Sequence, residues 1–415
     1  MNIVIIGNSA AGLSALETVR KYDSTSKITI ISKEGGLAYS RVLLPYFLRG
    51  KLSHDKLLIR NKAYYENNKV EYIEGNVTQI DAHNKNVILE GGNEVAYDKL
   101  LIATGSSAMS PPIPGINQEG IYHMWTKTDA EQLEPYYKAG NRVLVIGSGF
   151  VSLQAAWAAV VKGLKVTVVE LAERIMPSVL DEHGANVLTE SIRKNGVDLR
   201  LGTLTDRIEK QADGTFKVYL KEQEAVEVDF IIVGAGVRPN TQLIGESGIA
   251  VDRGILVDAY MQTNIPDIYS AGDVAQGPTT FGEKNVIHAL WPTAIEMGKV
   301  AALNMLGIEY QYEGSLNMNV TQMYDKTVAS IGKFTDNQVE TIHIFEDDGK
   351  RGYLKVCYEG EYVVGACLVG STEAVSLLGK LRPLIRNKVK VDTVPEKLEM
   401  FLQIKAFHSA RNLNI

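Results

Sequence analysis

Two short apolar runs in this chain are each followed by a glycine-rich turn and a helical pattern. The first run, Ile3–Ile6, has no polar position, which is typical of a parallel strand buried on both faces. It leads into a turn at residues 7–12, a helical pattern over Leu13–Lys21 and a second strand at Lys27–Ile31. The chain is therefore predicted to begin with a strand–turn–helix–strand unit.

The same unit recurs in the middle of the chain, starting with the apolar run Arg142–Ile146. In both copies a last strand ending in glycine follows a stretch of short alternating strands. The matching segments are 7–12 and 147–152 for the turn, 70–97 and 197–228 for the alternating strands, and 98–105 and 229–236 for the last strand. We therefore predict two domains of one fold, produced by internal duplication.

Beyond about Leu316 the pattern changes to antiparallel strands, followed by helical segments from about Thr372. The predicted strands include a hairpin over 353–358 and 361–368, turning at Glu359–Gly360. Stiff proline segments at Pro111–Gly115 and Pro239 mark crossings between domains. The fold class is therefore α/β, with two Rossmann-like dinucleotide-binding domains and a C-terminal α+β domain.

The composition of the chain excludes several classes of function but adds little about the fold. The chain has 415 residues, with 43 Lys and Arg against 49 Asp and Glu, a net charge of −6. This balance offers no overall attraction for nucleic acid, and the apolar runs are too short to span a membrane. No basic stretch precedes Ile3, so we expect no signal peptide and a cytoplasmic location.

The two cysteines, Cys357 and Cys367, are too few for a disulfide scaffold, a four-thiolate zinc site or an iron–sulfur cluster held by this chain alone. Both are expected to lie in the C-terminal hairpin. The predicted register pairs Cys357 with Tyr362 and Cys367 with Gly352, which separates the thiols by roughly 17 Å along the strands. We interpret both as sheet residues, and we expect no metal site.

The glycine turns suggest where the chemistry lies. A tight turn of this kind lets backbone N–H groups and a helix N-terminus approach a pyrophosphate. Serine replaces one glycine in each copy, at Ser9 and Ser152, and its hydroxyl is expected to bind phosphate. The candidate residues are Gly7, Ser9, Ala10, Ala11 and Gly12 in the first turn, and Gly147, Gly149, Phe150 and Val151 in the second.

Each turn is followed at a fixed distance by an acid that can accept hydrogen bonds from ribose hydroxyls. Glu34 lies 22 residues after Gly12, and Glu170 lies 18 residues after Ser152, close to the expected spacing of about 20. A carboxylate at Glu170 repels a 2′-phosphate, so NADH is favoured. Arg174, four residues further on, leaves NADPH open.

Two further motifs stand together with the glycine turns. They are residues 263–273, with the sequence TNIPDIYSAGD, and the segment Ala103, Thr104 and Gly105. They resemble the FAD-binding pattern of the pyridine nucleotide–disulfide oxidoreductase superfamily, and the resemblance covers essentially the whole chain. It implies an FAD-binding domain, 1–112 and 240–315, split by an NAD-binding domain, 113–239. An interface domain, 316–415, follows.

The resemblance also implies roles for single residues. Asp273, after Gly272, accepts hydrogen bonds from the FAD ribityl chain, and the helix opened by Trp291 points its N-terminus at the flavin pyrimidine. Phe150 covers the flavin until nicotinamide displaces it. Gly236 completes the NAD site, so the expected cofactors are FAD and NADH.

The stretch Ala38–Tyr46 resembles a branch that includes NADH:rubredoxin reductases and the NADH-binding flavoprotein portion of assimilatory nitrite reductases. This implies that Arg41 neutralises the FAD pyrophosphate. Ferredoxin-type relatives pair a lysine with a glutamate where this chain has Tyr46 and Gln154. We hypothesise that Gln154 instead binds the nicotinamide carboxamide.

Relatives that reduce disulfides, peroxide or oxygen use a redox cysteine beside the flavin, and this chain has none there. We therefore predict an enzyme that moves electrons between NAD(H) and a protein redox partner: rubredoxin, ferredoxin or an iron–sulfur subunit of a larger complex. The alternatives are reduction of a small acceptor (oxygen, a quinone or a disulfide) and a non-catalytic flavin-bound assembly or sensor subunit.

The C-terminal end carries an excess of positive charge that is a candidate docking surface for such a partner. Residues 380–415 have a net charge of +5, and their basic side chains are Lys380, Arg382, Arg386, Lys388, Lys390, Lys397, Lys405 and Arg411. A solvated helical face is the alternative. The apolar residues of the stretch 396–413 are expected to pack on the interface domain or to bind a second subunit, so a homodimer and a hetero-complex both remain open.

Overall fold

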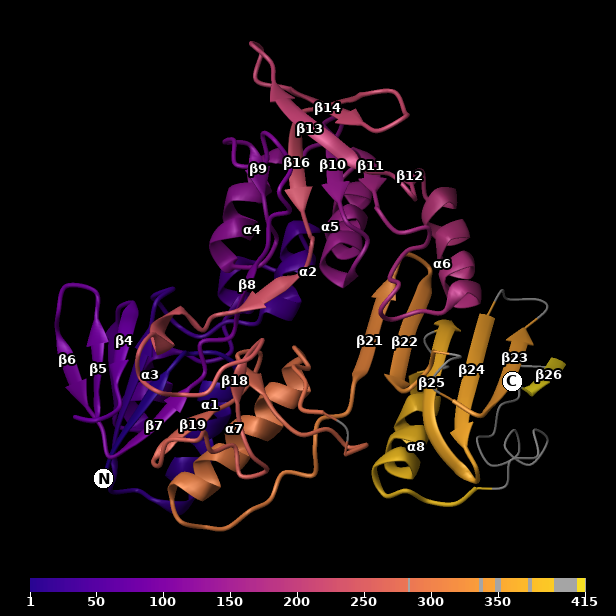
Figure 1. Ribbon diagram of the computed structural model, residues 1–415. Helices are drawn as coiled ribbons and strands as arrows, with labels where there is room; N and C mark the ends of the chain where they lie inside the picture. Colours follow the sequence, from indigo (N-terminus) through magenta and orange to yellow (C-terminus); the bar gives the residue numbers. More distant parts are fainter. Residues whose placement is uncertain (283, 336–338, 348–351, 372–374, 392–408, 415) are drawn as a thin grey trace. The chain divides into compact units, whose positions relative to one another are not determined.

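The computed structural model in Figure 1 describes residues 1–282, 284–335, 339–347, 352–371, 375–391 and 409–414. The chain forms two compact units. The first unit contains Met1–Arg41, Ser53–Ser107 and Val237–Leu316, and the second contains Val42–Leu52, Ala108–Gly236 and Asn317–Ile415. The three-domain boundaries given above remain predictions.

A parallel five-stranded sheet forms the centre of the first unit, in the order β19-β7-β1-β2-β3. An antiparallel sheet, β4-β5-β6, and two short strand pairs, β18-β20 and β17-β8, complete its strands. The strands are β1 Asn2–Ile6, β2 Lys27–Ser32, β3 Val70–Glu74, β4 Val77–Asp81, β5 Asn86–Leu89, β6 Glu94–Ala96, β7 Lys99–Ile102, β8 Ser106–Ala108, β17 Val237–Pro239, β18 Ile255–Leu256, β19 Ile268–Ser270 and β20 Ala275–Gln276. The helices are α1 Ala10–Tyr22, α3 Lys62–Asn67 and α7 Trp291–Met305, and the 3₁₀ turns are η2 His54–Leu57 and η4 Gln242–Ile244.

The second unit repeats this arrangement around the parallel sheet β12-β11-β10-β16-β9, with the antiparallel sheet β13-β14-β15 beside it. The strands are β9 Ile121–Tyr122, β10 Arg142–Ile146, β11 Lys165–Val169, β12 Asp198–Arg200, β13 Thr205–Lys210, β14 Phe216–Leu220, β15 Val226–Val228 and β16 Phe230–Val233. The helices are α2 Leu44–Leu48, α4 Lys127–Leu133, α5 Phe150–Val161 and α6 Glu182–Lys194, and η3 is Glu134–Tyr136.

The predicted duplication is visible in the strand registers. Strand β1 pairs with β2 from Asn2 opposite Lys27, and β10 pairs with β11 from Arg142 opposite Lys165. In both sheets the strand after the first helix lies on one side of the first strand, and the last strand of the repeat lies on the other. The two Rossmann-like sheets of the predicted α/β fold are therefore confirmed.

A six-stranded antiparallel sheet, β21-β22-β25-β24-β23-β26, completes the second unit. Its strands are β21 Met318–Met323, β22 Lys326–Gly332, β23 Thr341–Asp347, β24 Gly352–Glu359, β25 Tyr362–Gly370 and β26 Ser409–Asn414, and helix α8 is Val375–Arg386. Successive residues of β24 and β25 are buried on both faces. Helix α6 contacts both strands, and helix α8 contacts β25.

The predicted register of the C-terminal hairpin is wrong. The chain turns one residue later than expected, after Glu359, and a bulge between Cys357 and Tyr358 shifts the pairing once more. Cys367 therefore lies opposite Lys355, and Cys357 opposite Gly365, so the two thiols are near neighbours on one face. Both cysteines are buried sheet residues, as the sequence indicated.

No helix among the described residues is long and apolar enough to cross a membrane. The stretch 396–413 lies largely outside the described residues. Of its residues the structure describes the backbone of 409–413, which belongs to β26.

Helices α1 and α7 of the first unit pack with their backbones in close contact, because residue 298 of α7 is glycine. A Cβ atom at Gly298 would lie 2.2 Å from the carbonyl oxygen of Ala11, far inside van der Waals contact. Gly272 allows a similar approach, since its Cβ would lie 3.2 Å from the Cβ of Ala11 and 3.6 Å from that of Ala294. The beginning of α1, the beginning of α7 and the segment after β19 therefore converge.

We expect Gly298→Ala to lower the free energy of unfolding by roughly 1–3 kcal/mol, because the added methyl group must push α7 away from α1. Thermal unfolding followed by circular dichroism would measure the loss. Gly379→Ala is the matched control: Gly379 also lies within a helix, α8, but no atom lies within 4 Å of its added Cβ. It should leave the midpoint unchanged or raise it. Equal losses in both variants would contradict the close-packing argument.

Candidate dinucleotide-binding sites

The first glycine turn joins β1 to α1, and nearby backbone atoms leave no room for a side chain at its two glycines. A Cβ at Gly7, where φ is +121°, would lie 2.1 Å from the carbonyl oxygen of Ala103, and a Cβ at Gly12 would lie 2.0 Å from the carbonyl oxygen of Gly7. No larger residue fits either position. Ser9 is the N-cap residue of α1, yet its hydroxyl makes no capping hydrogen bond. The N–H groups at the start of α1, from Ala10 to Gly12, therefore lack a side-chain acceptor at the cap.

Glu34 and Arg41, predicted to bind different parts of FAD, form an ion pair in the structure. The hydroxyl of Tyr39 also donates to Glu34, and the Tyr39 ring centroid lies 5.4 Å from the guanidinium carbon of Arg41. Arg41 opens the 3₁₀ turn η1, Arg41–Leu43. The predicted ribose acid and the predicted pyrophosphate cation are thus adjacent, and sequence reasoning did not assign Tyr39 to this site.

Asp273 lies after β19, beside the Ala103–Gly105 segment that follows β7. The hydroxyl of Ser106 donates to Asp273 Oδ2 at 2.9 Å. Burial raises the pKa of the Asp273 carboxyl above its usual range, while the Ser106 hydrogen bond and the charge of Arg41 act in the opposite direction. The two carboxylates Asp273 and Glu34 therefore share Arg41 as a source of positive charge.

The segment after β7 is fixed by reciprocal hydrogen bonds. The hydroxyl of Thr104 donates to the carbonyl of Asn240 at 2.9 Å, and the Asn240 amide donates to the carbonyl of Thr104 at 2.9 Å. Gly105, where φ is +65°, faces open space. Sequence reasoning missed Ser106 and Asn240, although each directly follows a motif residue or a proline crossing that it had singled out.

Helix α7 begins at Trp291, as predicted, and its N-cap residue, Leu290, cannot cap it with a side chain. Trp291 is half-buried and packs against the hydrophobic core of the first unit. Pro292 lies in the first turn, where its missing N–H costs nothing.

The second glycine turn, between β10 and α5, follows the same plan. A Cβ at Gly147, where φ is +95°, would lie 2.5 Å from the carbonyl oxygen of Gly234. The hydroxyl of Ser152 donates to that oxygen at 3.1 Å, and Ser152 is buried, so the expected phosphate hydrogen bond from this serine is wrong. Gly149 is the N-cap residue of α5, which begins with Phe150 and Val151.

Glu170 directly follows β11, and its carboxylate contacts the second turn. Its Oε2 accepts from the N–H and the hydroxyl of Ser148, at 2.8 and 2.7 Å, and its Oε1 accepts from Ala172 N–H at 2.8 Å. The predicted acid and the predicted turn are therefore in contact. Sequence reasoning missed Ser148, which stands between two glycines. Gly236, where φ is +100°, faces open space after β16.

Gln154 lies on α5 and contacts β21 within the second unit. Its Nε2 donates to the hydroxyl of Thr321 at 2.7 Å and to the carbonyl of Gln322 at 2.8 Å. Its Oε1 is buried and has no hydrogen-bond partner. An acceptor left in this state is costly in an apolar setting, so the oxygen is suited to an N–H donor from a ligand.

Arg49 supplies a cation that sequence reasoning missed. Its guanidinium carbon lies 4.2 Å from the ring centroid of Tyr46 and 4.0 Å from that of Trp157, so the side chain is stacked between two aromatic residues. Arg49 is 5% exposed, and burial lowers the pKa of its guanidinium. Tyr46, which is predicted to stand where ferredoxin-type relatives have a lysine, is thus in contact with a buried arginine.

The helices at the candidate sites share the absence of a side-chain cap. Helices α3, α4 and α6 are capped by the side chains of Asn61, Thr126 and Asp181. Helices α1, α5 and α7 have no side-chain cap and no acidic residue in the first turn. The short helix α2 also lacks both features. Helices α1, α5 and α7 are the ones predicted to bind FAD or NAD, and their free N–H groups suit anionic or electron-rich ligand atoms.

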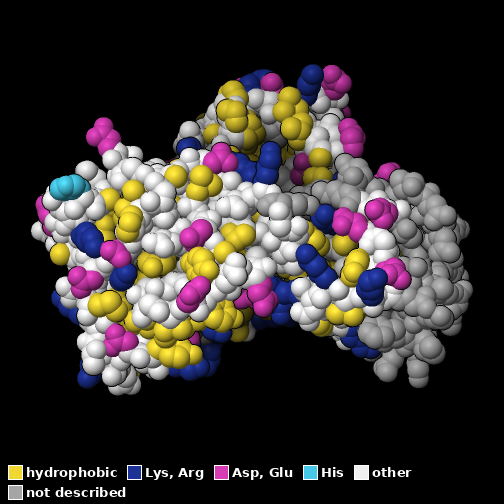
Figure 2. Space-filling model, turned by 60° about the horizontal axis from the view of Figure 1, so that its bottom comes forward, with side chains coloured by type: hydrophobic (Ala, Val, Ile, Leu, Met, Phe, Trp, Pro, Cys, Tyr) yellow, Lys and Arg dark blue, Asp and Glu magenta, His cyan; other side chains and the backbone are white. Residues whose placement is uncertain are grey.

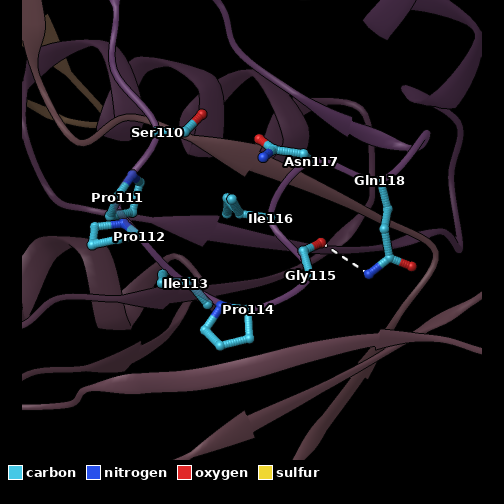
Figure 3. Close-up of a pocket in the computed structure, with 9 residues that line it drawn as sticks. All are labelled: Ser110, Pro111, Pro112, Ile113, Pro114, Gly115, Ile116, Asn117 and Gln118. Atoms are coloured by element: carbon cyan, nitrogen blue, oxygen red, sulfur yellow. Dashed lines mark hydrogen bonds between the residues drawn. The ribbon is translucent and has the colours of Figure 1, made fainter.

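The pocket drawn in Figure 3 is separate from both candidate nucleotide sites. It has a volume of about 600 Å³ and is lined by the consecutive residues Ser110–Gln118 of the proline-rich loop. It contains none of the predicted site residues, so we do not assign it to a nucleotide. Among the described residues no group of three or more His, Cys, Asp or Glu side chains is placed to hold a metal ion.

Comparison with known proteins identifies relatives that match most of this chain. The chain is 32% identical over 377 residues to the NAD(P)H nitrite reductase of Bacillus subtilis (strain 168), covering 89% of this chain and 46% of that protein, so it spans about half of that relative's length. It is 30% identical over 361 residues to the epsilon subunit of NADH-dependent phenylglyoxylate dehydrogenase of Aromatoleum evansii, covering 86% and 85% of the two chains. The structure of NADH:rubredoxin oxidoreductase from Clostridium acetobutylicum superposes with a TM-score of 0.76 at 25% identity, covering 95% and 97%.

A family model described as pyridine nucleotide-disulphide oxidoreductase matches residues 1–298. This range includes both glycine turns, Glu34, Glu170 and Asp273. The chain therefore belongs to the pyridine nucleotide-disulphide oxidoreductase family.

Proposed function

We propose that this chain is an FAD-dependent NADH oxidoreductase that moves electrons between NAD(H) and a protein redox partner. The observation that carries the proposal is that α1, α5 and α7, the helices at the candidate sites, all begin without a side-chain cap, two of them behind glycine turns too tight for any other residue. FAD supplies the chemistry: it accepts a hydride as an electron pair and can release the electrons singly. The protein binds, orients and screens the two cofactors.

In the first unit, the residues present fit FAD. The N-terminus of α1 would hold the pyrophosphate, with Arg41 as its counter-charge, and Glu34 would accept the ribose hydroxyls. Asp273, held by Ser106, would accept from the ribityl chain. The positive end of the α7 dipole would stabilise negative charge on the flavin pyrimidine.

In the second unit, the residues present fit NADH. The N-terminus of α5 would hold the pyrophosphate, and Glu170 would accept the ribose hydroxyls of the adenosine. The free Oε1 of Gln154 would accept from the nicotinamide carboxamide, which orients the ring. Phe150, the first residue of α5, would pack near the nicotinamide.

A thiol relay is not part of the proposal. Cys357 and Cys367 lie within the six-stranded sheet, both fully buried, and burial raises the pKa of the Cys367 thiol. Neither sulfur is available as a thiolate nucleophile, so electrons must leave the flavin for a centre outside the chain.

The names of the relatives support a protein partner. One relative is named as a subunit of an NADH-dependent dehydrogenase and another as an NADH:rubredoxin oxidoreductase. We therefore propose a rubredoxin, a ferredoxin or an iron–sulfur subunit as the partner, in the cytoplasm, with this chain as a homodimer or as part of a hetero-complex. Neither a nucleic acid nor a membrane is part of the proposal.

The basic C-terminal docking surface remains a proposal. Lys388 and Lys390 are exposed, and Lys390 forms an exposed ion pair with Glu361 at 2.7 Å. Lys397 and Lys405 lie outside the described residues, as does the side chain of Arg411. On the face shown in Figure 2, acidic and basic side chains are interspersed, so any steering of a partner depends on a local cluster.

Anaerobic titration with NADH tests the proposed reaction. We expect rapid bleaching of the flavin absorption, followed by rapid reoxidation with a rubredoxin or ferredoxin and slow reoxidation with oxygen or a disulfide. Rapid turnover with oxygen, a quinone or a disulfide would instead support the alternative of a small acceptor. Absence of bleaching would support the flavin-bound sensor or assembly subunit.

Gln154→Leu tests the proposed carboxamide contact. The variant should weaken NADH binding by about tenfold, the value of one hydrogen bond of about 1–1.5 kcal/mol, and should leave the FAD content unchanged. Stopped-flow flavin reduction at a series of NADH concentrations gives the dissociation constant. Gln322→Leu is the control, because the side chain of Gln322 is exposed and only its backbone carbonyl contacts Gln154. Unaltered NADH binding in the Gln154 variant would refute the contact.

The double variant Glu170→Ala/Leu171→Arg tests the nucleotide preference. Leu171 is 67% exposed beside Glu170, so an arginine there can reach a 2′-phosphate once the repelling carboxylate is gone. We expect the ratio of the NADPH to the NADH dissociation constant to fall by about tenfold or more. The control, Glu173→Ala, removes a nearby exposed carboxylate that does not follow the strand end directly, and it should leave the ratio unchanged.

A further inference from the structure

The segment that follows the proposed ribose acid, Glu170, has no regular secondary structure. Residues 171–180 connect Glu170, at the end of β11, to Asp181, the N-cap residue of α6, and contain no helix or strand. We call this segment the ribose loop. Just before the ribose loop, the Glu170 carboxylate accepts from the Ser148 N–H. Within the loop, the N–H of Met176 donates to the Ser148 hydroxyl at 3.3 Å. The first half of the ribose loop is thus held against the glycine turn.

The end of the ribose loop is held by a buried ion pair. Asp181 Oδ1 accepts from Gly184 N–H at 3.0 Å and caps α6, while Oδ2 accepts from Lys355 Nζ at 3.2 Å and from the hydroxyl of Tyr353. Tyr353 and Lys355 lie two residues apart on β24 and face the same side of the sheet. The end of the ribose loop is therefore fixed to the six-stranded sheet by two side chains.

Lys355 is unusual in its burial. It is 1% exposed, and among the side chains whose burial is described only Lys355 and Arg49 are both charged and buried. An ammonium group in this setting requires its carboxylate, because removal of one partner leaves an unpaired charge in a low-dielectric site. The ion pair with Lys355 therefore fixes the position of the Asp181 carboxylate.

Two further contacts reinforce the same junction. The ring of His183 stacks on that of Tyr353, with centroids 4.5 Å apart and an angle of 21° between the planes. The thiol of Cys367, which lies opposite Lys355 on β25, is 4.0 Å from the carbonyl oxygen of Val179 in the ribose loop. The ribose loop therefore packs on one face of the β24–β25 pair.

We propose that Lys355 is a positioning residue for the nucleotide: through Asp181 it holds the ribose loop, and with it Glu170, in the arrangement that binds the adenosine half. This inference rests on the proposed NADH site. Lys355 acts on binding and not on the transfer step, so its loss should raise the dissociation constant and leave the limiting rate of flavin reduction unchanged.

Lys355→Met tests the inference in the FAD-loaded, full-length protein. We expect the dissociation constant for ADP-ribose, measured by calorimetry, to rise by about 2- to 30-fold, the range expected for an indirect coupling of 0.5–2 kcal/mol. The dissociation constant for NADH from stopped-flow reduction should rise by the same factor. The limiting rate at saturating NADH should not change.

A second variant separates positioning from stability. Lys355→Met/Asp181→Asn leaves no unpaired charge, and asparagine caps a helix as well as aspartate does, so the thermal midpoint should recover. Binding of ADP-ribose should remain weak, because the ionic tie to the ribose loop is still absent. If the affinity recovers together with the midpoint, the role of Lys355 is only structural and the inference is overturned.

The matched control is Lys333→Met, which removes a partly buried lysine of the same sheet that pairs with Glu359 at 2.9 Å. This variant should bind ADP-ribose like the parent protein. Parent-like binding in Lys355→Met, together with weakened NADH binding in the Glu170 variant, would reject the inference and keep the proposed site. If the parent protein itself binds neither ADP-ribose nor NADH, the proposed function fails first.

Discussion

Both Rossmann-like sheets depend on the distance between one turn and the strand beside it. At Gly7 and at Gly147 the backbone of the turn lies so close to the carbonyl that follows the neighbouring strand that a side chain would overlap it. This contact brings the start of the next helix to the carboxyl edge of the sheet, with its first N–H groups free. The glycines therefore determine both the packing of α1 and α5 and the presence of anion-binding positions at their ends.

A few cationic side chains add to the effect of the glycine turns in each unit. Arg41 lies beside Glu34 and influences Asp273, so one cation serves two carboxylates in the first unit. In the second unit the buried cations Arg49 and Lys355 stabilise structure: one is stacked between aromatic rings, and the other is paired with Asp181. A single unpaired charge in such surroundings costs several kcal/mol.

The sequence predicted the parallel sheets well, because a strand buried on both faces leaves an uninterrupted apolar run, as in Ile3–Ile6, and because glycines mark the turns. The hairpin register was missed for the same reason. When both faces of β24 and β25 are buried, alternation gives no information about pairing, and a one-residue bulge next to Cys357 cannot be read from the residue types. Ser148, Ser106 and Arg49 were missed because their roles depend on partners distant in sequence: Glu170, Asp273 and Trp157.

The excursion of the chain through Val42–Leu52 has a practical consequence. Helix α2 contacts α4 and α5, and its residues Leu44, Phe47 and Leu48 are buried. The second unit is therefore not a contiguous piece of sequence that can be excised by cutting near residues 108 and 236. A gene fragment with those ends would leave uncovered the apolar surface on which α2 packs, and it would tend to aggregate. A soluble version of that unit requires α2 to be grafted back, for example through a circularly permuted chain.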